Sequence, residues 1–392
     1  MAALRSVAVK EIFESPDVRV VRHPGDGRHA CVVTFSSLNV HNNGFGDAFF
    51  AKHGVPAIHL IARWNHWWQP PSVRAAIAAV DEVLEYSGRP PVMTYGSSMG
   101  GFGAALYARD LGARNVLMLA PQWSANPATP PHEKRWATEA KRIDFVHDDL
   151  ASRLSPDAQK YLVFDPASLD APHAAMFAMA PRTTLLPCVD GGHVIAHTLQ
   201  QAGLLTDLVF SAMAGSLDVP GWRALWRDKR RKAGRFWYEL GLRAARHRRP
   251  ALSLHCLDTA TSLRPQEVVF QLDYAYALLK RKQVDRSVEV FTAATNLSPD
   301  HPAPWRGLSI ARRVQRQHRF AVEAAERGLA LRPTSGDLRR VLTQALIEAG
   351  ENGRALDAIL PAVQAEPANA DNRRLFDRAR AALEAAMVRV TS

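Results

Sequence analysis

The hydrophobic positions divide the chain into two parts with different patterns. In the first part, short continuous apolar runs alternate with polar loops and amphipathic segments. Such runs are typical of strands buried on both faces of a sheet. We expect strands at 18–23, 29–35, 55–62, 91–95, 115–120, 160–165 and 183–190, and helices at 72–86, 101–110 and 204–217. This alternation predicts an α/β fold with a doubly wound, mostly parallel sheet.

Beyond about residue 218 the chain has no β-rich stretch and carries a repeat. Prolines recur every 34 residues, at Pro265, Pro299, Pro333 and Pro367. Trp237-x-x-Leu-Gly and Trp305-x-x-Leu-Ser return in phase with them, and Tyr274-Ala275 matches more weakly. Small and bulky residues also return in phase, at Ser287, Phe291 and Ala294, at Ala321, Ala325 and Gly328, and at Ala355, Ile359 and Ala362.

This region resembles the tetratricopeptide repeat (TPR) family, whose period is about 34 residues. The resemblance implies an all-α solenoid of four units at 234–267, 268–301, 302–335 and 336–369, followed by a capping helix and tail at 370–392. Arrays of this family usually present a curved surface to a peptide or partner protein. A role in self-association or as a spacer is the alternative.

The strand expected at 91–95 leads directly into Gly96-Ser-Ser-Met-Gly100, and a helix is expected from Gly101. This is a G-x-S-x-G sequence between a strand and a helix. Small residues two before and two after Ser98 let strand and helix pass closely, so that the turn projects the Ser98 hydroxyl from the sheet's carboxyl edge. Here the chain resembles the α/β-hydrolase superfamily. A glycine-rich turn with an incidental serine is the alternative.

The resemblance implies a serine nucleophile, an acid and a histidine base, in that chain order. The serine needs the histidine to take its proton, and the histidine needs a carboxylate to orient it. His193, behind two glycines after the last expected strand, is the expected base, with His173 and His197 as rivals. Asp170, just past the penultimate strand, is the expected acid. Asp165, at that strand's end, is the alternative acid, or a cap for backbone N–H groups of the loop.

A tetrahedral intermediate would need two hydrogen-bond donors for its oxyanion. The backbone N–H of Met99 is expected to be one of them. The loop after the strand at 29–35 should supply the other, from Ser36 or, failing that, Ser37. The chain lacks the His-Gly pair that many relatives carry there. Ser97 is expected to be a hydrogen-bonding neighbour of the site.

Two further segments follow strands at the same edge of the sheet. Residues 63–70 contain Trp64, His66 and Trp67, which could line the site and stack on a sugar or an aromatic acyl group. Packing of the elbow loop is the alternative. Residues 122–159, rich in proline and tryptophan, are expected to be an insertion over the site, either a lid or a long structural loop.

Composition narrows the class of protein. With 392 residues, 47% hydrophobic and 22% charged, the chain resembles ordinary soluble globular proteins of more than one domain. It has no apolar stretch of about 20 residues, and its N-terminus lacks the apolar core of a secretory signal. Three distant cysteines have no metal-ligand spacing and suggest a reducing compartment, so a cytoplasmic location is expected, with neither metal nor organic cofactor.

The net charge of +11 is concentrated between residues 223 and 249. A solvated helical face explains this better than a site for an acidic polymer or a membrane surface. No nucleic-acid-binding motif accompanies it, so no nucleic-acid partner is expected.

The predicted organisation is a hydrolase domain at 1–218, a basic linker at 219–233, and the repeat array. The predicted function is a serine esterase or acyl hydrolase, acting on a small-molecule or glycan acyl ester and coupled to a protein-binding array. The alternatives are an acyltransferase acting on a glycan, and an inactive hydrolase-fold scaffold whose array binds proteins.

Overall fold

A computed structural model describes residues 10–26 and 29–391, with side chains up to residue 388. The N-terminal segment, which the sequence predicts to lack a secretory signal, therefore lies largely outside the described residues. The chain divides into two compact units, residues 1–239 and 240–392. Within the described ranges, no helix combines the length and the apolar character needed to cross a membrane.

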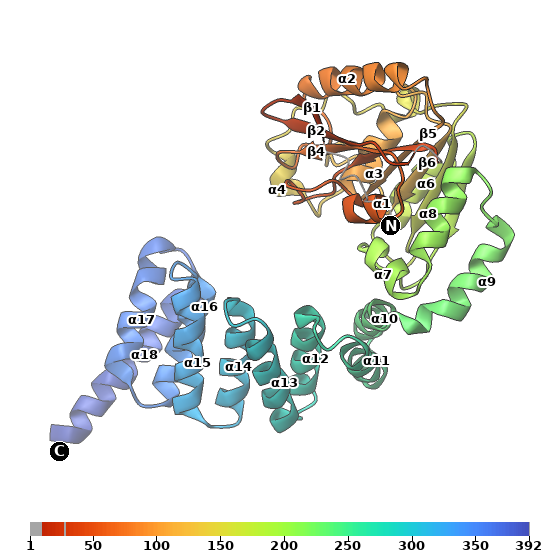
Figure 1. Cartoon of the computed structure of the whole chain (residues 1–392). Coiled ribbons are helices and arrows are strands. Elements are labelled where there is room, and N and C mark those ends of the chain that lie inside the picture. Colours follow the sequence, from red (N-terminus) through yellow and green to blue (C-terminus); the bar gives the residue numbers. More distant parts are fainter. Residues whose placement is uncertain (1–9, 27–28, 392) are drawn as a thin grey trace, which may run out of the picture. The chain divides into compact units, whose positions relative to one another are not determined.

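The first unit is built on an eight-stranded mixed sheet (Figure 1). Its strands are β1 (Lys10–Glu14), β2 (Val18–His23), β3 (Cys31–Phe35), β4 (Ala57–Ala62), β5 (Val92–Ser97), β6 (Asn115–Leu119), β7 (Gln159–Phe164) and β8 (Thr183–Pro187). They lie in the order β1-β2-β4-β3-β5-β6-β7-β8. The strands from β4 to β8 are parallel, whereas β1 and β2 pair antiparallel at one edge.

Helices cover both faces of this sheet. Alternate residues of the central strands share one apolar core with α2 (Ser72–Tyr86), α3 (Met99–Leu106) and α6 (Ala171–Ala178). On the other face, α1 (Asp47–Lys52) lies beside α8 (Leu205–Ala214), because Phe210 contacts the rings of Phe49 and His53. Helix α7 (Ile195–Gln201) contacts α8. Burial on both faces explains why the central strands read as continuous apolar runs.

Three segments differ from the sequence-based expectation. Neither the edge strand β1 nor the short helix α1 was expected. The predicted linker at 219–233 is instead helix α9 (Val219–Lys229) followed by a 3-10 turn (Arg230–Lys232). Trp222 and Trp226, four residues apart, bury their rings along one side of α9, and the Trp226 indole donates to Val189 O. This packing places α9 within the first unit.

The strand order reverses direction between β3 and β5. The chain passes from β3 outward to β4, and then returns to the other side of β3 to form β5 and the strands beyond it. Ligand sites in open parallel sheets form at such a switch point, outside the carboxyl ends of the strands. Ser37, just after β3, and Ser98, just after β5, lie at this point.

The second unit is an array of antiparallel helix pairs (Figure 1). Its helices are α11 (Pro250–Leu263), α12 (Val268–Lys280), α13 (Val284–Leu297), α14 (Pro302–Val314), α15 (His318–Leu331), α16 (Gly336–Glu348), α17 (Asn352–Ala365) and α18 (Ala370–Thr391). Helix α10 (Gly234–Arg246) contains the division between the units. Helices α12, α14, α16 and α18 begin at residues 268, 302, 336 and 370, which keeps the expected 34-residue period.

A hydrogen bond repeats with the same period. The fourth residue of each first helix donates from its side chain to the carbonyl six residues earlier, in the preceding turn. The pairs are Trp237 to Arg231 O, Gln271 to Pro265 O, Trp305 to Pro299 O and Arg339 to Pro333 O. The donor is an indole in two units, an amide in one and a guanidinium in one, while the acceptor is always a backbone carbonyl. The repeat is therefore a repeat of contacts as well as of sequence.

Candidate functional site

The turn between β5 and α3 holds Ser98 in a strained conformation. Its φ of 54° and ψ of −121° are unusual for a residue with a side chain. The two flanking glycines make this possible by close approach. A Cβ on Gly96 would lie 2.2 Å from Gly100 O, and one on Gly100 would lie 2.2 Å from Phe35 O. The turn therefore accepts only glycine at these two places and pushes the Ser98 hydroxyl out.

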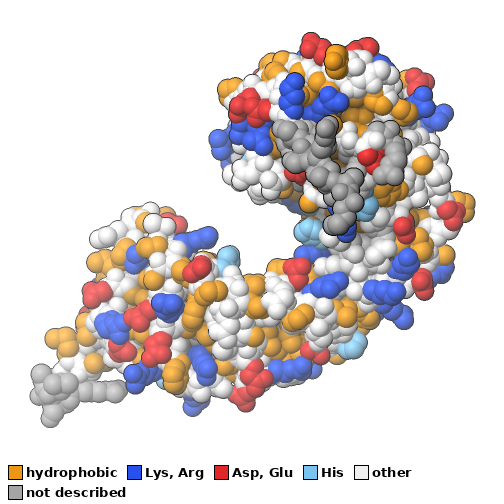
Figure 2. Space-filling view, viewed as in Figure 1, with side chains coloured by type: hydrophobic (Ala, Val, Ile, Leu, Met, Phe, Trp, Pro, Cys, Tyr) orange, Lys and Arg blue, Asp and Glu red, His pale blue; other side chains and the backbone are white. Residues whose placement is uncertain are grey.

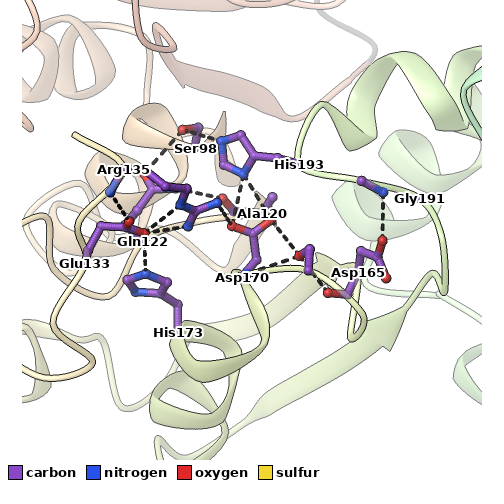
Figure 3. A network of polar contacts seen from close by, with 12 residues as sticks. Ser98, Ala120, Gln122, Glu133, Arg135, Asp165, Asp170, His173, Gly191 and His193 are labelled. Atoms are coloured by element: carbon purple, nitrogen blue, oxygen red, sulfur yellow. Dashed lines mark hydrogen bonds and ion pairs between the residues drawn. The ribbon is translucent and has the colours of Figure 1, made fainter. Parts of the chain in front are cut away.

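Three side chains from distant parts of the sequence meet at this turn (Figure 3). Ser98 Oγ lies 3.0 Å from His193 Nε2, and His193 Nδ1 lies 3.0 Å from each carboxylate oxygen of Asp170. An ionised carboxylate only accepts, so Nδ1 carries the ring proton and Nε2 presents its lone pair to Ser98. Asp170 is buried, with 1% exposure, whereas the His193 ring is partly open to solvent.

Asp165 holds the loop that carries His193 rather than the ring itself. Its Oδ1 accepts from the backbone N–H groups of Ala167 and Asp190, and its Oδ2 accepts from Gly192 N–H. Burial raises the pKa of the Asp165 carboxyl; the three backbone bonds act in the opposite sense without outweighing it. Of the two acids that the sequence left open, Asp170 contacts the imidazole and Asp165 caps the loop.

Asp170 has two further contacts. Arg135, in the insertion between β6 and β7, places Nη1 2.7 Å from Asp170 Oδ1, and the Ser168 hydroxyl, in the loop after β7, lies 3.1 Å from Asp170 Oδ2. Burial alone would raise the pKa of the Asp170 carboxyl, but the bonds and charges of His193 and Arg135 outweigh it and hold that pKa below its ordinary value. Asp170 is therefore held in its ionised form.

Two buried residues, Glu133 of the insertion and His173 of α6, hold Arg135 in place. Its Nε and Nη2 donate to Glu133 Oε2, which also accepts from His173 Nε2 at 2.9 Å. His173 Nδ1 accepts a hydrogen bond from Trp123 N–H. The ring proton is therefore on Nε2, which donates a hydrogen bond to Glu133. Burial would raise the pKa of Glu133, but the bonds from His173 and Arg135 lower it well below its ordinary value. His173, a rival base in the sequence, thus anchors the insertion.

Ser98 has one further polar neighbour, Gln122. The Ser98 hydroxyl lies 3.3 Å from Gln122 Oε1, which also accepts from the Trp67 indole at 3.4 Å. Gln122 Nε2 donates to Ala120 O. The Ser98 proton therefore has two acceptors within reach, the His193 nitrogen and the Gln122 oxygen.

Of the two expected oxyanion donors, the Met99 N–H is available and the Ser36 N–H is already bonded. Met99 is the first residue of α3, so its N–H has no acceptor within the helix. The Ser36 expectation is wrong for a backbone donor. The Ser36 N–H donates to Leu60 O, and its Oγ accepts from Ala62 N–H, because strand pairing with β4 continues through this residue.

Ser37, the alternative donor, differs from Ser36 in its backbone contacts. No described residue accepts from its backbone N–H, while its hydroxyl donates to Ser97 O at 3.0 Å. That bond ties the loop after β3 to the end of β5, beside Ser98. Ser97 acts here through its carbonyl. The N–H groups of Met99 and Ser37, which no described residue accepts, thus belong to the two segments that flank the switch point.

The tryptophan segment after β4 mostly packs against the fold. Trp64 and His66, which were expected to line the site, instead contact Asp17. The Trp64 indole donates to Asp17 Oδ1, and His66 Nε2 contacts Asp17 O, so both side chains are engaged with the β1–β2 connection. Trp67 is fully buried. The neighbouring Trp68 donates to Met99 O and so supports the turn that carries Ser98.

An aromatic residue from the insertion lies closer to the imidazole. The Trp136 ring centroid is 5.4 Å from that of His193 and 5.7 Å from that of Trp67, and the Arg135 guanidinium lies over its face at 4.3 Å. Sequence patterns did not indicate Trp136, Arg135 or Glu133 individually, because they lie in an irregular segment with no period. His197, the other rival base, is exposed on α7.

Comparison with known proteins adds little to this geometry. No family model matches the chain, and no curated protein matches it. Among solved structures, it is similar to MamA (residues 41 to the end) from Desulfovibrio magneticus RS-1, at 17% identity over 43% of this chain and 97% of that one, with a TM-score of 0.35. It is also similar to the Sgt2 TPR domain from Aspergillus fumigatus, at 20% identity over 31% of this chain and 81% of that one, with a TM-score of 0.29.

Proposed function

We propose that the first unit is a serine hydrolase of the α/β-hydrolase type, an esterase or acyl hydrolase that works through an acyl-enzyme on Ser98. The observation that carries the proposal is the hydrogen-bonded chain from Ser98 through His193 to Asp170. A strained serine, a correctly tautomerised imidazole and a buried carboxylate are what acyl transfer requires. The doubly wound, mostly parallel sheet expected from the sequence agrees with the parallel strand order from β4 to β8.

The proposed reaction moves one proton through His193. Nε2 takes the Ser98 hydroxyl proton as Oγ attacks the acyl carbon, and the backbone N–H groups of Met99 and Ser37 hold the oxyanion. The imidazolium then gives its proton to the departing alcohol oxygen, which leaves the acyl group on Oγ. A water enters, gives a proton to Nε2 and attacks the acyl carbon, and the acid leaves as Oγ recovers the proton. A sugar hydroxyl in place of water would make the same site an acyltransferase.

A fluorophosphonate probe tests the proposal, because it reacts with serines activated by a neighbouring base. We expect the full-length chain to be labelled stoichiometrically, and Ser98→Ala to be unlabelled. Ser152→Ala is the matched control, since Ser152 is an exposed serine on α5 (Leu150–Arg153) whose hydrogen bonds to described residues stay within its own turn. Chromogenic esters of increasing acyl length would then define the acyl group.

Two results would overturn the hydrolase proposal. Failure of the folded wild-type chain to react with the probe would leave an inactive scaffold. Equal labelling of wild type and Ser98→Ala would assign the reactivity to another residue. Transfer of a labelled acyl group to an added sugar, faster than its release to water, would identify the acyltransferase.

We also propose that the repeat array binds an acidic peptide. A cavity of about 310 Å³ between α14, α16 and α18 supports this, because its lining holds more basic than acidic side chains. The basic ones are Arg306, Arg313, Arg340 and Arg374, and the acidic ones are Asp337 and Asp371. Arg313, Arg340 and Arg374 pair with nearby carboxylates, whereas no described carboxylate pairs with Arg306, which donates to Tyr276 Oη. On the visible surface of the array, basic and acidic side chains are interspersed (Figure 2).

Fluorescence anisotropy with a glutamate-rich peptide and a lysine-rich peptide of equal length tests this second proposal. Binding of the acidic peptide should weaken in Arg306→Ala and as salt is raised. Arg319→Ala, on the outside of α15, should bind like wild type, because its side chain is 89% exposed. Equal binding of the two peptides, or no effect of Arg306→Ala, would contradict the proposal.

A further inference from the structure

Three potential metal ligands meet on the α1 and α8 face of the sheet. They are His23 at the end of β2, His59 in β4 and Asp47 at the start of α1, and their ligand atoms all lie within 4.8 Å of one another. His23 Nε2 is 3.1 Å from Asp47 Oδ1, and His59 Nε2 is 3.8 Å from the same oxygen. No residue proposed to take part in acyl transfer belongs to this group.

Sheet register explains why the two histidines share a face. In the antiparallel pairing of β2 with β4, Val21 lies opposite His59 and His23 opposite Ala57. His23 and His59 are thus diagonal neighbours on the same side of the sheet, a spacing that long side chains can bridge. The loop after β3 then crosses this position, because a Cβ on Gly44 would lie 2.2 Å from His59 Cγ. This crossing brings Asp47 to the pair.

His59, the inner ligand, has a buried nitrogen with no hydrogen-bond partner among the described residues. His59 is 1% exposed, its Nε2 is shielded from solvent, and no described residue forms a hydrogen bond with that atom. Its other nitrogen, Nδ1, lies 2.6 Å from Thr34 Oγ1, the residue opposite it in the β3–β4 register. A buried polar atom without a partner costs about 1–3 kcal/mol. The fold retains such an atom here, directed toward the other two ligands.

We propose that His23, His59 and Asp47 form a binding site for a divalent transition-metal ion, with Zn²⁺ as the best fit. Two imidazoles and one carboxylate suit zinc and its neighbours better than Mg²⁺ or Ca²⁺, which take oxygen ligands. Bonds of about 2.0–2.1 Å in a tetrahedral site place ligand atoms about 3.3 Å apart. The separations of 3.1 and 3.8 Å are close to this value, and the third, which is at most 4.8 Å, needs the ligands to approach by about 1.5 Å or less.

The surrounding residues support this assignment. With the metal on Nε2, His59 Nδ1 carries the ring proton and donates to Thr34 Oγ1, the kind of outer contact that orients a ligating imidazole. Asp47 is 35% exposed, which leaves a side open for a fourth ligand such as water. The ion would fasten the start of α1 to β2 and β4, and hence the far end of the loop that begins at Ser37. The sequence had indicated no metal, because the three ligands are far apart in it.

Calorimetric titration of the tag-free, chelator-treated full-length chain with Zn²⁺ tests the proposal. We expect one ion per chain, with a rise in melting temperature on binding. His23→Gln and Asp47→Asn, both at partly exposed positions, should weaken binding by about 100-fold or more while leaving the circular dichroism unchanged. His247→Gln, at an exposed histidine on the second unit, should bind Zn²⁺ like wild type.

A substitution that leaves all three ligands in place distinguishes a specific Zn²⁺ site from non-specific binding of Zn²⁺. Thr34→Val removes the hydroxyl beside His59 Nδ1 and should weaken Zn²⁺ binding about 10–100-fold, as loss of an outer contact does. Replacing Zn²⁺ by Co²⁺ should give the visible absorption of a tetrahedral ion in wild type and not in His23→Gln. The proposal is wrong if wild type binds no stoichiometric ion, or if His23→Gln and Asp47→Asn both bind Zn²⁺ as wild type does.

Discussion

Arg135 Nη1 lies 2.7 Å from Asp170 Oδ1, and the same carboxylate accepts the Nδ1 proton of His193. A residue of the insertion thus shares the proposed catalytic acid with the proposed catalytic base. The ionisation of Asp170 therefore depends on where the insertion between β6 and β7 places Arg135.

Removal of Arg135 should change the pH dependence of the reaction. Arg135 helps to hold the pKa of the Asp170 carboxyl low against the effect of burial, so its loss should raise the pKa of that carboxyl. In Arg135→Ala, the acid limb of the kcat/KM profile for a chromogenic ester should move to higher pH. Arg142→Ala, at an exposed arginine of the same insertion, should keep the wild-type profile. A uniform drop in rate with no displaced limb would indicate a purely structural role.

The two candidate acids should respond differently to the same substitution. Asp170→Asn places an amide against His193 Nδ1 and favours the wrong tautomer, a change that lowers kcat by about 10⁴ in a comparable triad. Asp165→Asn should instead loosen the loop at Gly192, because one of its two acceptor atoms becomes a donor. We expect a loss of about 1–3 kcal/mol in unfolding free energy with a smaller fall in kcat. The reverse ranking of the two kcat values would exchange their roles.

The second oxyanion donor can be tested by removing a backbone N–H group. Ser37→Pro deletes the N–H that no described residue accepts, and we expect kcat to fall about 10²–10³-fold. Ser37→Ala removes only the bond to Ser97 O and should reduce kcat far less. Melting curves of both variants distinguish lost catalysis from lost structure. Similar kcat values for Ser37→Pro and Ser37→Ala would assign the oxyanion to other donors.

Glu133 should contribute to stability only above acidic pH. Its pKa is lowered in the folded chain from an ordinary value of 4.5, so its contribution is complete above that value and disappears as the pH falls toward the folded pKa. At neutral pH, Glu133→Gln should lower the unfolding free energy by about 1–3 kcal/mol. Chemical denaturation at a series of pH values should show the two chains converging in acid. A gap that is constant with pH would contradict this account.

Local sequence was sufficient for the parts of the site that depend on local geometry. Glycines two residues either side of Ser98 allow main-chain contacts of a kind that no other residue permits, so the turn was predictable from a few positions. The period of the array was predictable for a similar reason, since each 34-residue unit repeats the same contacts.

Sequence was insufficient where three-dimensional proximity decides. Asp165 and Asp170 both follow one strand, and only the path of the loop determines which carboxylate meets the imidazole. Ser36 and Ser37 are adjacent, and one extra residue of strand pairing with β4 decided between them. Arg135 and Glu133 carry no periodic signal, because charged residues in an irregular segment look like solvated surface until their partners are known.

Side-chain hydrogen bonds to backbone carbonyls recur along the array, from Trp237 to Arg339. They affect how such an array can gain repeat units. Each uses a main-chain acceptor and any long side chain that ends in N–H, so duplicated units need conserve no particular donor. A single inserted residue between Pro299 and Trp305 would move the indole off its carbonyl and alter the geometry of one junction alone. Insertion of a whole 34-residue unit therefore preserves these hydrogen bonds, whereas insertion of a few residues breaks the one at the insertion point.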